Sequence, residues 1–112
     1  FRSDNTNKGA RLTWTTESEL ENAGFYILRS EKRDGQFKVV TPAMIQGAGT
    51  TAERNTYTWI DSDIKPNTGY YYRIVDVSYA GMQTTLATVR LRGLVVPNRK
   101  DWVTWGSLKK ER

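Results

Sequence analysis

Tyr70, Tyr71 and Tyr72 form the most conspicuous cluster of side chains with binding chemistry in this sequence. They follow a turn-rich segment, residues 65–69, with the sequence KPNTG. Aromatic rings in a row can stack on sugars, bases or peptides. If the segment is a β-strand, however, Tyr70 and Tyr72 face one way and Tyr71 faces the other. A platform of three rings is then excluded, and Tyr71 alone is free to face solvent or a cross-strand neighbour.

Three other segments could in principle bind a metal ion or a phosphate. Residues 17–21 hold three glutamates and residues 61–63 hold two aspartates, but neither segment has the ligand spacing of an EF-hand calcium loop. We predict a solvated acidic loop for the first and a turn for the second. The segment QGAGTT, residues 46–51, lacks the Lys-Ser/Thr of a phosphate-binding loop and is predicted to be a flexible loop. We expect no metal and no cofactor.

The composition argues against catalysis. Neither histidine nor cysteine occurs among the 112 residues, which removes the commonest general base, thiol nucleophiles, disulfides and the usual zinc ligands. Only Ser/Thr–Lys pairs or carboxylate pairs remain, and nothing in the sequence places such a pair together. We therefore expect a protein that is not an enzyme and has no catalytic residues.

The length suits one domain with its own core and a tail. Apolar runs are only a few residues long, so we expect no membrane insertion. The net charge of +5 permits weak attraction to acidic polymers. The chain begins at Phe1 without the pattern of a signal peptide, and we expect it to be a piece of a longer protein.

The elements that must position these residues are predicted to be β-strands. Hydrophobic and polar residues alternate with a period of two, and no segment of useful length has the period of a helix. An Asp-Gly pair at residues 34–35 is a strong hairpin signal. The predicted strands are residues 10–16, 24–30, 36–41, 56–61, 70–78 and 84–93, with weaker strand character at 44–45. About seven short strands bounded by turn residues predict an antiparallel β-sandwich.

The segment IKPNTGYYYRI, residues 64–74, resembles the fibronectin type III signature L-x-P-x-T-x-Y-x-V-R-V. Trp14, in the segment LTWTT, looks like the core tryptophan of the second strand in that family. More narrowly, residues 10–93 are similar to fibronectin III-like modules near the C-termini of large secreted or cell-surface bacterial proteins. The resemblance implies a seven-stranded fibronectin III-like (immunoglobulin-like) sandwich over residues 1–93 and an extracellular location.

The resemblance also implies scaffold roles for most of the tyrosine cluster. Tyr70 fits the tyrosine corner, in which the hydroxyl bonds to backbone of the turn that contains Pro66. Tyr72 and Trp14 are expected in the core. Asp76 departs from the family pattern, which usually has a small apolar residue there. A buried lone carboxylate would be costly, so we expect Asp76 near the strand end, where it accepts hydrogen bonds from loop N–H groups or a hydroxyl.

Residues 94–112 form a basic tail of different composition. They hold five Lys/Arg against two acids, a net charge of +3, and two of the four tryptophans. A disordered segment rarely contains two tryptophans, so we expect part of the tail to be buried against a partner. The residues predicted to make this contact are Trp102, Val103, Trp105 and Leu108. Their alternation suits strand addition to a sheet edge, in cis or in trans, and the absence of a continuous basic run argues against nucleic acid.

Two function hypotheses follow. The first is a non-catalytic structural or interaction module of a secreted or cell-surface protein, which acts in spacing, docking or assembly through its tail. Its partners would be proteins, either other copies of the chain or neighbouring domains. The second is a carbohydrate- or polymer-binding module that uses surface aromatic residues such as Tyr26, Trp59 and Tyr71. The second hypothesis requires a flat patch of two or three exposed rings on one sheet face.

Overall fold

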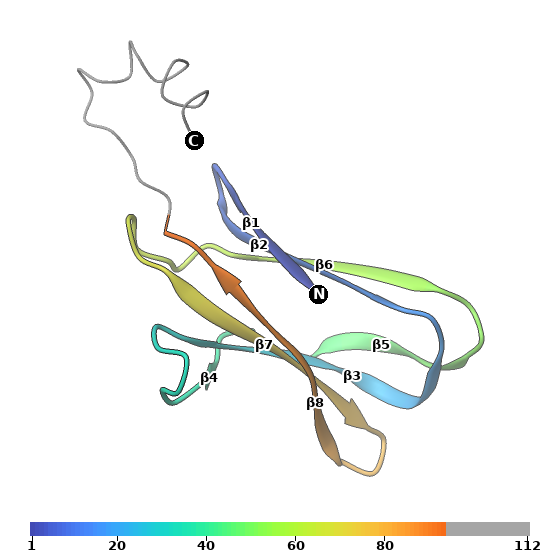
Figure 1. The fold of residues 1–112 in the computed structure, drawn as a ribbon. Coiled ribbons are helices and arrows are strands. Elements are labelled where there is room, and N and C mark those ends of the chain that lie inside the picture. Colours follow the sequence, from blue (N-terminus) through green and yellow to red (C-terminus); the bar gives the residue numbers. More distant parts are fainter. Residues whose placement is uncertain (94–112) are drawn as a thin grey trace.

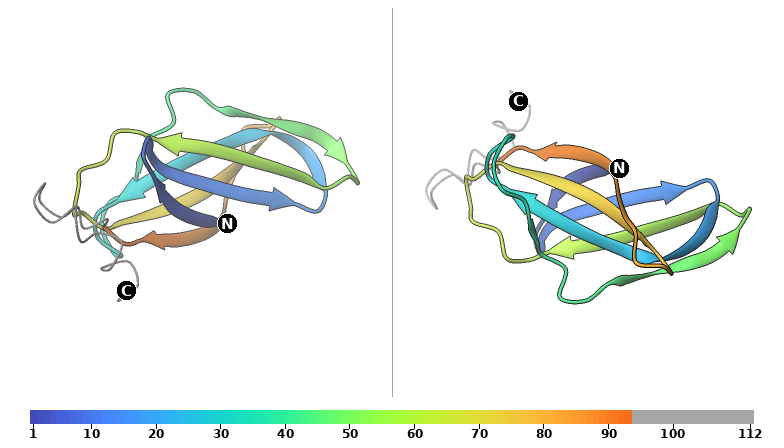
Figure 2. Two further views of the ribbon diagram at one scale, coloured as in Figure 1. Left: turned by 90° about the horizontal axis from the view of Figure 1, so that it is seen from above. Right: turned by 90° about the horizontal axis from the view of Figure 1, so that it is seen from below.

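The computed structural model describes residues 1–93, which form two antiparallel β-sheets packed face to face (Figures 1 and 2). The strands are β1 (Arg2–Thr6), β2 (Gly9–Thr16), β3 (Glu19–Ser30), β4 (Lys38–Val39), β5 (Ile45–Thr51), β6 (Asn55–Asp61), β7 (Tyr70–Ser78) and β8 (Gln83–Leu91). The smaller sheet has the order β1-β2-β6, and the larger has the order β4-β3-β7-β8 with β5 paired to β3. The predicted antiparallel β-sandwich is confirmed, with eight strands in place of seven. No helix that could cross a membrane occurs in the described residues.

Three segments differ from the sequence prediction. β1 was not predicted, because its sequence RSDNT has no hydrophobic alternation, yet it pairs with β2 along its whole length. The glycine-rich segment 46–51 is not a loop but part of β5, which lies along the first half of β3. β3 itself begins at Glu19, so the predicted acidic loop is reduced to residues 17–18. In each case strand pairing determines the conformation of a segment whose own composition does not favour a strand.

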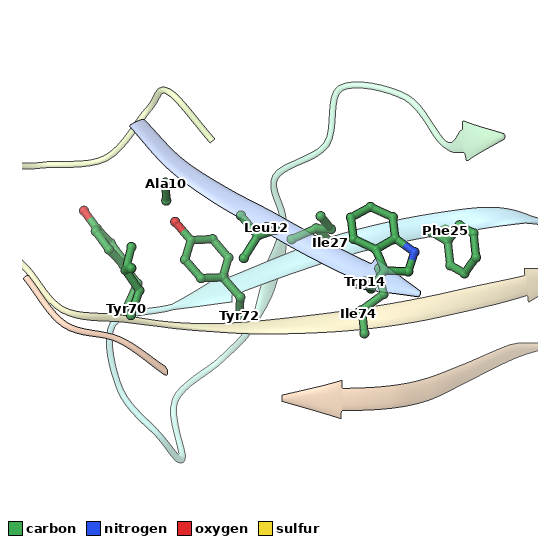
Figure 3. Packing of buried hydrophobic residues seen from close by; sticks show 9 residues of the cluster. Ala10, Leu12, Trp14, Phe25, Ile27, Tyr70, Tyr72 and Ile74 are labelled. Carbon is green, nitrogen blue, oxygen red and sulfur yellow. The ribbon is translucent and has the colours of Figure 1, made fainter. Parts of the chain in front are cut away.

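The core lies between the two sheets, where alternate residues of β2, β3 and β7 face one another (Figure 3). The buried cluster consists of Ala10, Leu12, Trp14, Phe25, Ile27, Tyr70, Tyr72, Ile74 and Leu91. Trp14 stacks on Tyr57 with 5.5 Å between ring centroids and meets the edge of Phe25 at the same distance. Trp14 and Tyr57 belong to the smaller sheet and Phe25 to the larger, so this aromatic group joins the two sheets.

The strand registers place the connections at two opposite ends of the sandwich (Figure 1). At the first end, which we call the hairpin end, the β2–β3, β5–β6 and β7–β8 connections lie together. At the second, the corner end, Tyr70 pairs with Leu91, and the β1–β2 turn lies with the β6–β7 loop and residue 93. The tail therefore begins at the corner end.

Candidate functional site

The three consecutive tyrosines lie on β7 and are divided between its two faces. Tyr70 is 2% exposed and Tyr72 is 0% exposed, and both belong to the core cluster with Trp14. Tyr71 is half-buried on the outer face of the larger sheet. The structure therefore does not bring the three rings together as one binding platform.

Tyr70 fixes the loop between β6 and β7. Its hydroxyl accepts a hydrogen bond from the backbone N–H of Lys65 at 2.8 Å. Pro66 follows in the same loop and is exposed, and its carbonyl accepts a hydrogen bond from the Thr68 hydroxyl at 3.2 Å. This is the geometry of a tyrosine corner, with the Tyr70 hydroxyl bonded to the chain itself rather than presented to a ligand.

We expect Tyr70→Phe to lower the free energy of unfolding by about 1 kcal/mol, because one hydrogen bond is lost while the ring stays buried. Denaturant-induced unfolding measures this change. The matched control is Tyr71→Phe, since the Tyr71 hydroxyl forms no hydrogen bond with the described residues. Loss of a binding activity by Tyr70→Phe at unchanged stability would contradict the scaffold role.

A buried ion pair beneath this corner escaped the sequence analysis. Asp61 is 2% exposed and accepts hydrogen bonds from Arg29 Nη1 at 2.7 Å and from Tyr72 Oη at 2.8 Å. Arg29 Nη1 also donates to the backbone oxygen of Asp63 at 3.0 Å. Asp61 ends β6 in the smaller sheet, whereas its two donors lie on β3 and β7 in the larger. The cluster therefore joins the two sheets at the corner end.

The electrostatics of this cluster favour a charged pair with a protonated tyrosine. Burial by itself lowers the pKa of Arg29, but the hydrogen bond to Asp61 and its negative charge outweigh burial and leave that pKa above its ordinary value. Burial and the hydrogen bond to Asp61 raise the pKa of Tyr72, so its hydroxyl remains a donor. One feature of the sequence indicated this pair. Arg29 lies on the same face of its strand as Phe25 and Ile27, and a cation on the core-facing side needs an anionic partner.

Glu19 is buried, so the predicted solvated acidic loop is wrong for this residue. Its side chain is 8% exposed at the start of β3. Its carboxylate accepts hydrogen bonds from Tyr57 Oη at 2.5 Å, Asn22 Nδ2 at 2.7 Å, Thr16 Oγ1 at 2.8 Å and Ala48 N at 2.9 Å. These donors come from four strands, β6, β3, β2 and β5. One carboxylate thus fixes the hairpin end of the sandwich.

The donors around Glu19 also set its charge. Burial by itself raises the pKa of Glu19, but the four hydrogen bonds, of which that from Tyr57 is the strongest, outweigh burial and lower the pKa. Burial and the contact with Glu19 raise the pKa of Tyr57 to about 12. The pair is therefore a carboxylate and a neutral phenol at neutral pH. A carboxylate with four donors has no free lone pair for a metal ion or a substrate.

Asp76 lies near the end of β7 but differs from the prediction in its contacts. It is only partly buried and forms no hydrogen bond with the described residues, so the predicted donors are not found. A register shift after Ile74 alters the alternation of β7 against β8, and the carboxylate does not enter the core. Asp76 instead lines a hollow of about 180 Å³ with Leu20 and Met82.

The surface aromatic residues do not form a flat patch in residues 1–93. Trp59 packs against the core from β6, and Tyr26 and Tyr71 are half-buried. The guanidinium of Arg73 lies 3.9 Å from the ring centroid of Phe37, and a second arginine lies 5.9 Å from that of Tyr71. Several of these rings therefore pack against the protein itself. Nor does this part of the chain hold a group of three carboxylates that could bind a metal ion.

β8 is an edge strand of the larger sheet and leads directly to the tail. It pairs with β7 on one side only. On its other side β1 approaches the end of the strand, where Ser3 Oγ donates to Arg90 O and Asn5 Nδ2 donates to Arg92 O. On the side away from β7, residues 83–87, QTTLA, have no strand beside them among the described residues, and they contain neither proline nor charge. Such an edge can accept an added strand.

The residues predicted to contact a partner lie outside the described residues. They are Trp102, Val103, Trp105 and Leu108. The boundary predicted between a domain of residues 1–93 and a tail of residues 94–112 therefore stays a prediction.

Comparison with known proteins identifies the fold. The sequence matches no model of a known protein family, and no curated protein is similar to it in sequence. The structure is similar to the crystal structure of an Fn3-like protein from Clostridium thermocellum, with a TM-score of 0.55 and 23% sequence identity over 86% of this chain and 90% of that chain. The fold is fibronectin III-like, as the resemblance implied. At this identity the likeness shows the fold alone.

Proposed function

We propose that this chain is a non-catalytic interaction module of a secreted or cell-surface protein. The sandwich acts as a rigid scaffold, and residues 94–112 act as its contact segment in docking or assembly. A fibronectin III-like fold supports a modular role, because such sandwiches present loops and edges from a stable core.

The open edge of β8 carries this proposal. Residues 83–87 pair with β7 but lack a strand on their outer side among the described residues, and the same strand leads into the basic, tryptophan-containing tail. Natural sheets usually protect such an edge with charge, proline or a covering segment. Here the sequence supplies an adjacent segment, DWVTWGS at residues 101–107, whose alternation suits a strand. Its addition to an edge would provide main-chain hydrogen bonds for affinity and tryptophan side chains for specificity.

Deletion of residues 94–112 tests the proposal. We expect residues 1–93 to remain folded with little change in melting temperature, because the core cluster and both buried carboxylates lie within them. Association of the chain should be lost at the same time. Thermal melting followed by circular dichroism, together with the mass in solution, measures both quantities. A monomer that loses stability on deletion would show that the tail docks on its own sandwich, and unchanged association would rule out the tail as the contact segment.

A further inference from the structure

The hairpin end carries a cluster of exposed apolar side chains. Leu20, Tyr79 and Met82 are 77%, 66% and 72% exposed. Leu20 and Met82 line the same hollow of about 180 Å³, between the start of β3 and the β7–β8 hairpin. Tyr79 is anchored beside them: its N–H donates to the Glu21 backbone oxygen at 3.1 Å, and its hydroxyl lies close to Gly49 on β5. Large apolar side chains gathered at one extremity of a small domain mark a contact surface.

The same end is acidic. It carries five carboxylates and one arginine, a net charge of −4: Glu17, Glu19, Glu21, Glu53, Asp76 and Arg54. Glu19 is buried with its four donors, and Glu17 pairs with Arg54 at 3.4 Å. Glu21, Glu53 and Asp76 have no ion-pair partner among the described residues. The apolar cluster is therefore rimmed by unneutralised negative charge.

The opposite, corner end is weakly basic. Its cations are Lys8 in the β1–β2 turn, Lys65 in the β6–β7 loop and Arg92 after β8, against one exposed carboxylate, Asp63, and the paired Asp61. The tail begins at this end and adds a net charge of +3 with two tryptophans. The hairpin end is thus acidic and apolar, and the tail that begins at the other end is basic and contains tryptophans. The tail and the hairpin end therefore have opposite charges, and both carry apolar side chains.

We propose that the tip formed by Leu20, Glu21, Asp76, Tyr79 and Met82 binds the tail, residues 94–112, of a second copy of this chain. This inference rests on the proposed function and extends the receiving surface from the open edge of β8 to the tip at the start of that strand. The tryptophans of the tail cover Leu20 and Met82, and its lysines face the carboxylates of the rim.

The length of the tail keeps its first tryptophan, Trp102, away from the tip of its own chain. Met82 lies eleven positions before Gly93, which is about 36 Å along an extended strand. To return alongside β8, the tail must first reverse direction, which takes about four residues. Trp102 lies nine positions after Gly93, so about five positions remain after the turn and span at most ~18 Å. Trp102 therefore stops well short of its own tip. Residues 107–112 are far enough along the chain to reach that tip, but they would not bring Trp102 with them. Contact of Trp102 with the tip therefore requires a second copy, which joins copies head to tail.

Sedimentation equilibrium of the full-length chain tests the apolar part of the tip. We expect Leu20→Ser combined with Met82→Ser to raise the dissociation constant at least about tenfold. Both side chains are largely exposed, so the variant should remain folded. The matched control is Val39→Ser, which removes an apolar side chain that is 54% exposed on β4, away from the tip. Equal weakening by the control would contradict the proposal.

Charge reversal tests the rim. Asp76→Lys should weaken association, and raising the salt from about 50 mM to about 500 mM should weaken association of the unmodified chain. Mixing Asp76→Lys with a chain that carries Lys109→Glu and Lys110→Glu should restore association between the two variants. Asp34→Lys, in the exposed loop between β3 and β4, is the control and should have no effect.

The outcomes separate this inference from the proposed function. If deletion of residues 94–112 abolishes association but the tip variants associate normally, the tail is the contact segment and its site lies elsewhere, so the inference is wrong. If the deletion leaves association unchanged, the proposed function is wrong as well. A full-length chain that stays monomeric at all concentrations overturns the head-to-tail contact.

Discussion

Asp61→Ala is expected to lower the free energy of unfolding by about 3–5 kcal/mol, because it leaves a partly buried cation and a buried tyrosine hydroxyl without their shared partner. Arg29 is only partly exposed and directs Nη1 to Asp61 at 2.7 Å. Tyr72, which is fully buried, would lose the acceptor of its hydroxyl at the same time. Urea-induced unfolding at neutral pH measures the change.

Two companion variants identify the cause of that loss. Asp61→Leu combined with Arg29→Met should recover much of the stability, because replacing both charges with apolar groups removes the unpaired cation. Asp4→Ala is the control, since the ion pair of Asp4 with Arg11 is exposed to solvent and its loss should change the stability far less. A change below about 1 kcal/mol for Asp61→Ala would show that the buried pair does not hold the sheets together.

Glu19→Ala is expected to have the second largest effect, a loss of about 3 kcal/mol. The substitution leaves Asn22 Nδ2, Ala48 N and Tyr57 Oη without their acceptor. Unpaired buried donors cost more than the hydrogen bonds themselves contribute. The control is Glu17→Ala, because Glu17 is exposed and its ion pair with Arg54 lies at the surface.

Acid unfolding should depend on the same carboxylate. The pKa of Glu19 is lower in the folded chain than its ordinary value, so its contribution to stability is present above the unfolded pKa of about 4.3 and is lost as the pH falls through the folded pKa. Glu19→Ala should therefore lose less stability than the unmodified chain between about pH 5 and about pH 2. Identical acid profiles for the two chains would contradict the assignment of this effect to Glu19.

The sequence predicted those parts of the fold that depend on local alternation. β2 and β7 have regular patterns with large side chains, and the sandwich follows from such patterns with the turn residues between them. β1 and β5 have no such pattern, and they become strands because β2 and β3 offer edges to pair with. Pairing across the sheet is a tertiary effect that a local pattern does not contain.

The polar clusters were missed for a related reason. Glu19 and Asp61 each stand in short acidic segments that also suit solvated turns. Their burial depends on donors from distant strands: Tyr57 lies 38 residues from Glu19, and Arg29 lies 32 residues from Asp61. The alternation of β3 placed Arg29 on the same side as the core residues, but nothing in a single sequence identified the carboxylate that pairs with it.

These two clusters bear on the proposed function because each fixes one end of the module. Asp61 joins the sheets at the corner end, where the tail begins, and Glu19 joins four strands at the hairpin end, next to Leu20 and Tyr79. Under the proposed function, a rigid body between the two contact regions would transmit their spacing and orientation from one copy to the next. The same core would then serve both spacing and assembly.

Disulfide trapping between copies tests the central claim most directly, because the chain contains no cysteine. Met82→Cys is placed in one preparation and Ser107→Cys in another, and the two are mixed under mild oxidation. We predict a mixed dimer that forms faster than in a control mixture of Val39→Cys with Ser107→Cys. A mixed dimer no more abundant than in the control would contradict contact between the tail of one copy and the tip of the next.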